Sequence, residues 1–168
     1  MSSGLVMPVA DDALLDVDAV ALEEDTFLVL SADPTPRETH ENPESLMRQV
    51  STFEAQPLGS VLVTGKNPLQ FLAIVHDLNQ EPTCREEWVV SALREIFHQA
   101  ERRRTRRLAL PMLGTVHGSL TPRRFVDLFE PALAESNVEH LERIWVVVPD
   151  GTGGDVRDSL ATLGLPLQ

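Results

Sequence analysis

The sequence predicts an α/β fold in which a mixed sheet lies between helices, a three-layer α/β/α sandwich. Strand and helix patterns alternate from residue 43 onward, as they do in sheets that are covered by helices. Residues 71–76 are nearly all apolar, which suits a strand buried on both faces. The chain of 168 residues is long enough to bury one sizeable core, so we expect a single domain over residues 1–168.

The first third of the chain predicts three strands. Residues 5–9 are small and apolar with a proline, which suits a short edge strand. Residues 18–22 alternate as a central strand would, and residues 26–31 also read as a strand. The segment between the first two strands carries four aspartates in eight positions.

The middle of the chain predicts a loop, a helix and two strands. Residues 33–43 contain three prolines and few apolar side chains, so they read as a surface loop. Pro43 then opens a helix through about residue 53. Residues 59–64 and 71–76 form strands joined by a turn at 65–68. His76 ends the second strand, and we interpret it as a hydrogen-bonded structural residue rather than a base or metal ligand.

The last part predicts the order helix, strand, helix, strand, helix. Residues 85–104 carry apolar side chains at intervals of three and four, and residues 107–111 are a buried strand. A helix over 121–136 has Thr121 as its cap, while Pro131 predicts a kink or break. Residues 141–148 form the clearest strand, parallel to 107–111, and residues 149–168 form a glycine-bearing loop and a short helix.

Composition and charge narrow the function classes. The net charge of −12 opposes general electrostatic binding to nucleic acid or anionic lipid. No signal segment and no membrane-spanning run is visible, so we expect a cytoplasmic protein. The single cysteine, Cys84, excludes an intrachain disulfide and reads as a bystander. The histidines are scattered, and we predict no metal site and no cofactor.

Positive charge is concentrated in one segment. Five of the 14 lysines and arginines fall within six positions: Arg102, Arg103, Arg104, Arg106 and Arg107. Cations at a helix end complement its dipole, which is the reading we favour. The alternative is a binding surface for a nucleic acid, a phosphorylated ligand, an acidic partner chain or a second copy of the protein.

The run from residue 108 to residue 122 joins an apolar strand to a glycine-bearing loop that leads into a helix. Gly114 and Gly118 permit close backbone approach, and the N–H groups of residues 115–119 are placed to converge on a phosphate beside the helix N-terminus. A strand, loop and helix with two glycines is also an ordinary β-to-α connection. Both readings of the loop remain open on the residues alone.

In its order of motifs, the chain resembles the macro domain family. Gly59–Thr64 matches a Gly-x-x-x-x-Thr strand, Phe71–His76 a hydrophobic strand ending in His, and the loop after Leu108 an Ala-x-Pro-x-x-Gly-Thr-Gly segment. The resemblance covers residues 55–149 well and residues 11–54 poorly. It implies a macro-domain-like sandwich and a pocket for ADP-ribose or a related nucleotide diphosphate.

The resemblance also implies which residues contact the ligand. Asp11 would receive the adenine amino group; the alternative is that it belongs to an acidic turn between two strands. Asp25 falls in the segment where the family has the asparagines that hold its ligand. The phosphate loop would be Gly114, Thr115, Val116, His117, Gly118 and Ser119. Two features depart from the family. Glu23-Glu24-Asp25 replaces its asparagines, and Val116 replaces a glycine where a β-branched side chain resists positive φ.

Three functions follow from these features. Binding of ADP-ribose or a similar nucleotide is favoured, because the loop keeps Gly114, Thr115 and Gly118 in order. A degenerate scaffold that acts through protein contacts is the alternative, since Val116 and the acidic cluster oppose a diphosphate. Hydrolysis of ADP-ribose derivatives ranks third, with Glu24 or Asp25 as a general base and His117 nearby.

Overall fold

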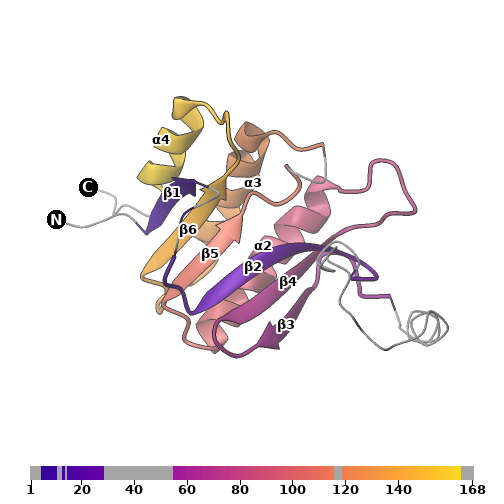
Figure 1. Cartoon of the computed structure of the whole chain (residues 1–168), viewed down its shortest axis with the longest axis horizontal. Helices are drawn as coiled ribbons and strands as arrows, with labels where there is room; N and C mark the ends of the chain where they lie inside the picture. The colour runs from indigo at the N-terminus through magenta and orange to yellow at the C-terminus, as the bar shows by residue number, and fades with distance from the viewer. Residues whose placement is uncertain (1–4, 11–12, 14, 29–54, 116–118, 164–168) are drawn as a thin grey trace, which may run out of the picture.

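The protein forms one mixed six-stranded sheet with helices packed against it (Figure 1). The computed structural model describes residues 5–10, 13, 15–28, 55–115 and 119–163. Its strands are β1 (Val6–Ala10), β2 (Ala19–Asp25), β3 (Val61–Gly65), β4 (Leu69–His76), β5 (Arg107–Pro111) and β6 (Arg143–Val148). The order across the sheet is β1-β6-β5-β2-β4-β3, and only β3 runs antiparallel to its neighbour. The predicted mixed sheet and α/β class are confirmed.

Three helices lie together in one layer against the sheet. They are α2 (Glu86–Arg102), α3 (Pro122–Glu135) and α4 (Gly154–Thr162). Helix α3 contacts both α2 and α4, while α2 packs on β4 and α4 on β1. The surface loop predicted at 33–43 and the helix predicted at 43–53 lie outside the described residues.

The core lies between this helix layer and the sheet. The apolar stripe of α2 faces the sheet, as its spacing predicts, with Leu93, Ile96 and Phe97 fully buried. Phe129 of α3 meets the Phe97 ring edge-on at 5.9 Å and stacks on Phe125 at 5.7 Å. The facing aromatic rings hold α2 and α3 in register above the sheet.

Helix α3 begins at its predicted cap and ends at Glu135, close to the predicted end at residue 136. The Thr121 side chain accepts a hydrogen bond from the Arg124 N–H, and Pro122 occupies the first helical position. The predicted break near Pro131 is absent, since the helix runs without interruption to Glu135. Pro131 is exposed, so water can hydrogen-bond the Asp127 carbonyl that loses its helical partner.

The strand predicted over residues 26–31 is wrong in its described part. Thr26 and Phe27 form a turn directly after β2, and Leu28 has a left-handed φ of 61°. The Asp25 side chain accepts the Phe27 N–H at 2.7 Å, and the Asp25 carbonyl accepts the Leu28 N–H at 3.1 Å. An aspartate that bonds the backbone two residues on favours a turn over the continuation of a strand.

The sheet opens between β2 and β5. Only Ala19 with Leu108 and Val20 with Ala109 pair there, whereas β5 and β6 pair over five positions. After β2 the chain goes on to β3 and β4 on one side, and after β5 it goes to β6 on the other. The carboxyl ends of β2 and β5 therefore form a topological switch point, and open α/β sheets usually bind their ligands in a crevice at such a point.

Candidate nucleotide site at the switch point

The loop after β5 borders this crevice, and its first glycine is fixed by packing. Gly114 has a φ of 85°, and a Cβ placed there would lie 2.4 Å from the Leu120 side chain and 3.2 Å from the Cys84 sulfur. The Leu120 N–H bonds back to the Gly114 carbonyl at 3.1 Å. A side chain at this position is excluded both by the left-handed backbone and by the contact with Leu120.

The remaining residues of the predicted phosphate loop are only partly described. The Thr115 N–H and hydroxyl both donate to the Met112 carbonyl, at 3.1 and 2.7 Å. Ser119 is exposed at the far end of the loop. Val116, His117 and Gly118 lie outside the described residues, as does Asp11, the predicted adenine acceptor.

Glu23 connects β2 to this loop. Its Oε1 accepts the Gly114 N–H at 2.9 Å and also contacts the His76 Nε2, while the side chain is only 7% exposed. The Glu23 carboxylate therefore already accepts a backbone N–H at the start of the predicted phosphate loop. The sequence places Glu23 in an acidic cluster but does not predict this hydrogen bond. The feature that could have predicted a contact between Glu23 and His76 is that both lie near the carboxyl ends of neighbouring parallel strands, which meet at one edge of the sheet.

His76 is buried at the end of β4 and held from two sides. Its Nε2 meets Glu23, and its Nδ1 lies 3.2 Å from the Thr83 hydroxyl. These contacts link β2, β4 and the segment before α2. They are the contacts of a hydrogen-bonded structural histidine, as the sequence predicts.

Glu24 and Asp25 are buried, with no exposed surface. The Glu24 Oε2 lies 3.2 Å from the Asp25 N–H, and the Asp25 Oδ1 accepts the Phe27 N–H. Both carboxylates thus engage the backbone of the turn after β2. That placement gives Asp25 a role in shaping the crevice wall, and it gives neither side chain access to solvent as a general base.

Cys84 lies beside Gly114 with 4% of its surface exposed. Burial, together with the negative charge of Glu23, raises the pKa of the thiol to about 12. The thiolate is the reactive form of cysteine, so this environment makes Cys84 a poor nucleophile at neutral pH.

A hollow of about 340 Å³ continues from Ser119 and Cys84 toward the first turns of α2 and α3. Arg124 spans it and pairs with Glu86 through two hydrogen bonds of 2.5 and 2.9 Å. That hydrogen bonding holds the pKa of Glu86 below its ordinary value and raises that of Arg124. A second turn lies at the same edge of the sheet, where the Thr152 hydroxyl donates to the Pro149 carbonyl at 2.6 Å.

The arginine-rich segment lies at the opposite edge of the sheet. Arg102 ends α2, Arg103 caps it, and Arg107 begins β5. In the part of the chain that the structure describes, no group of three or more histidine, cysteine or acidic side chains could hold a metal ion. Among those same residues, no helix has the length and apolarity to cross a bilayer.

Comparisons with known proteins show the fold. The structure is similar to the macro domain of ganglioside induced differentiation associated protein 2, with a TM-score of 0.66, 15% identity and coverage of 97% of this chain and 85% of that one. It is also similar to the macrodomain of Thermus aquaticus DarG, with a TM-score of 0.60, 18% identity and coverage of 87% and 99%.

Some similar structures contain nucleotides. The Oceanobacillus iheyensis macrodomain with ADP aligns with a TM-score of 0.61 and 14% identity, over 91% of this chain and 86% of that one. Another structure of that macrodomain was solved with ADPR. Neither the family models nor the curated proteins gave a match to the sequence. The structural similarities show that the chain has the macrodomain fold.

Proposed function

We propose that this protein binds ADP-ribose or a related nucleotide diphosphate in the crevice at the carboxyl ends of β2 and β5. The observation that carries the proposal is the switch point itself. The β2–β5 ladder ends after two residue pairs, and the loop that begins at Gly114 stands beside the opening. Crevices of this kind are where open α/β sheets take their ligands.

The surroundings of the crevice suit a phosphate group. The loop leads directly into the capped N-terminus of α3, where backbone N–H groups and the helix dipole favour negative charge. Ser119 is exposed just before that terminus and offers a hydroxyl donor. Similar folds that were solved with ADP or ADPR support a nucleotide as the ligand class.

Glu23 sets the strength of this binding. Its carboxylate occupies the Gly114 N–H and lies at the wall of the crevice, so it opposes a diphosphate electrostatically. Contact with His76 offsets part of that charge. We expect affinity in the micromolar range or weaker.

A second function is favoured by the same contact. If the Glu23 bond to the Gly114 N–H persists when a nucleotide is offered, the crevice stays closed to it. The protein would then act as a scaffold that works through contacts with other protein chains. Binding assays separate the two functions directly.

The deciding experiment is calorimetric titration of the full chain with ADP-ribose. Saturable one-to-one binding by the wild type is expected, together with its loss in Gly118→Glu, which adds a carboxylate to the phosphate loop. Ala134→Glu adds the same charge on an exposed position of α3 and serves as the matched control. No heat at millimolar ADP-ribose would reject nucleotide binding and leave the scaffold function.

A further inference from the structure

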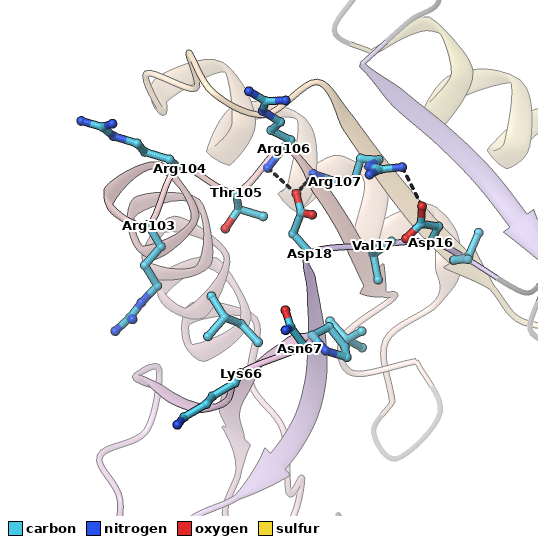
Figure 2. Close-up of a pocket in the computed structure, with 14 residues that line it drawn as sticks. Asp16, Val17, Asp18, Lys66, Asn67, Arg103, Arg104, Thr105, Arg106 and Arg107 are labelled. Atoms are coloured by element: carbon cyan, nitrogen blue, oxygen red, sulfur yellow. Dashed lines mark hydrogen bonds and ion pairs between the residues drawn. The ribbon is translucent and has the colours of Figure 1, made fainter.

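A larger hollow lies at the opposite edge of the sheet, below the amino ends of β2 and β5 (Figure 2). We call it the basal hollow. It has a volume of about 900 Å³ and lies between the end of α2, the segment before β2 and the turn between β3 and β4. The proposed nucleotide function uses none of its residues.

The basal hollow is positive within an acidic protein. Five cationic side chains line it: Lys66, Arg103, Arg104, Arg106 and Arg107. Two carboxylates, Asp16 and Asp18, also line it, so its formal charge is +3, against −12 for the whole chain.

Both carboxylates of the basal hollow are already engaged. The Asp18 Oδ2 accepts the N–H groups of Arg106 and Arg107 at 2.9 and 3.1 Å. Asp16 pairs with the Arg107 guanidinium at 3.1 Å. By contrast, Lys66 and Arg104 form no ion pair with any residue that the structure describes. The charge that remains available to a ligand is therefore positive.

A buried hydroxyl points into the basal hollow. Thr105 is 2% exposed, and its Oγ1 has no hydrogen-bond partner among the described residues. Figure 2 shows this oxygen directed into the space between Arg103 and Asp18. A buried polar group without a partner costs free energy, and such groups are rare in folded proteins unless a ligand or ordered water satisfies them.

The backbone beside Thr105 adds a third observation. Helix α2 ends with hydrogen bonds from the Arg104 N–H to the Glu101 carbonyl and from the Thr105 N–H to the Ala100 carbonyl. This is the Schellman arrangement, in which the left-handed position is usually glycine. Here it is Arg104, with a φ of 55°. Arg104 is therefore held beside the hollow at some cost in backbone strain.

From these three observations we propose that the basal hollow binds a small anion that carries several phosphate groups. Arg103 and Lys66 extend on the same side of the hollow, while the Arg104 side chain points away from it (Figure 2). Guanidinium and ammonium groups bind phosphate oxygens through charge-assisted hydrogen bonds, and the Thr105 hydroxyl donates a further one. A net charge of −12 opposes the long-range attraction that a nucleic acid would need, so a small anion is the better match.

Inorganic tripolyphosphate is the probe, because it has the charge of the proposed ligand and no base or ribose. Calorimetric titration of the full chain at low salt is expected to show one-to-one binding that weakens as salt is added. Lys66→Gln and Thr105→Val are each expected to weaken it by about fivefold or more. Arg94→Gln removes an exposed cation elsewhere on α2 and serves as the control.

Thermal unfolding gives a second readout for Thr105→Val. The substitution removes an unpaired buried hydroxyl and keeps the shape of the side chain, so the melting temperature should stay level or rise while tripolyphosphate binding falls. A purely structural threonine would show no loss of binding. This combination also excludes misfolding as the cause of a loss.

Two outcomes would overturn the proposal: no binding of tripolyphosphate to the wild type, and binding that both hollow variants retain. In the second case, loss of binding in Gly118→Glu would assign the phosphate site to the crevice between β2 and β5. Failure of ADP-ribose to bind would not contradict the proposed anion site in the basal hollow, because tripolyphosphate binding is tested separately.

Discussion

At the scale of single residues, Glu23 fixes the loop that follows β5. It joins β2 to a loop 91 positions away in the sequence, and it does so with a charged acceptor. Hydrogen bonds to charged acceptors are about twice as strong as neutral ones, so this one stabilises the loop. The same charge works against any anion that enters beside it.

Replacing Glu23 with glutamine tests this opposition. Two unit charges about 8 Å apart at an effective dielectric constant of roughly 20 interact by about 2 kcal/mol. After allowance for the partner His76, we expect Glu23→Gln to tighten ADP-ribose binding by roughly tenfold, as measured by calorimetry. The amide oxygen can still accept the Gly114 N–H, so the loop should keep its shape. Unchanged affinity would mean that the carboxylate does not face the ligand.

Cys84 should be chemically inert. With a pKa of about 12 and almost no exposed surface, its thiolate is a very small fraction of the total at pH 8. Iodoacetamide at that pH is expected to label the native protein at least 100-fold more slowly than the denatured protein, by intact mass. Rapid labelling of the native protein would show that the loop beside Cys84 opens.

At the scale of elements, the end of α2 holds one residue in a strained backbone conformation, which should lower the free energy of unfolding. Arg104 holds the left-handed position of the Schellman motif, where glycine adopts the same φ without strain. Arg104→Gly is expected to raise the free energy of unfolding by about 1 kcal/mol, measured by urea denaturation. Arg103→Gly, at the neighbouring position with a negative φ, is the control and should not be stabilising. A loss of stability in Arg104→Gly would contradict the strain.

Glu101 ties α2 to the segment that enters β6. Burial acts to raise its pKa, but hydrogen bonds from the His140 side chain and from neighbouring backbone N–H groups outweigh this and hold the pKa below its ordinary value of 4.5. A carboxyl with a depressed pKa stabilises the fold above 4.5, and that contribution disappears as the pH falls through the folded-state pKa.

Glu101→Gln should therefore lower stability by about 1 kcal/mol at pH 7 and change it little at pH 3. Urea denaturation of both proteins at the two pH values measures the difference. Glu95→Gln, on the same helix, is the control, because the Glu95 carboxylate accepts a hydrogen bond from Gln99 of its own helix rather than from the segment before β6. An equal loss at both pH values would mean that the carboxylate charge is not what stabilises this junction.

At the scale of the whole molecule, the helix layer and the sheet share one core. Phe129 is fully buried and contacts aromatic rings of both α2 and α3. Phe129→Ala is expected to cost about 3–5 kcal/mol, measured by chemical denaturation. A cost below 1 kcal/mol would show that Phe129 contributes little to the shared core.

The fold could be read from the sequence because its signals are local. The apolar stripe of α2, the Thr121 cap of α3 and the apolar run of β4 each indicate a helix or strand within a few residues. The turn after β2 was missed because Thr26 to Leu28 look like a strand, while the Asp25 side chain bonds to the backbone and bends the chain there.

The sites were harder to predict because they depend on contacts between distant segments. The bond between Glu23 and Gly114 joins two elements that no local pattern relates. The basal hollow likewise joins Lys66, Asp18 and Thr105 from three separate segments. In the sequence the arginine run reads first as a helix end, and only the fold shows beside it a hydroxyl that has no partner among the described residues.

The short ladder between β2 and β5 has a mechanical consequence. Strands β1, β6 and β5 form one hydrogen-bonded half of the sheet and β2, β4 and β3 the other, and the ladder between β2 and β5 has two residue pairs. Just before that ladder, Asp18 bonds to the backbone of Arg106 and Arg107. The molecule thus contains a seam, bridged at its upper end by the Glu23 side chain. A nucleotide bound there would contact both halves of the sheet and hold them together. The protection of backbone amides from hydrogen exchange that it gives should therefore be greatest along the junction of β2 and β5, with little change at the outer strands.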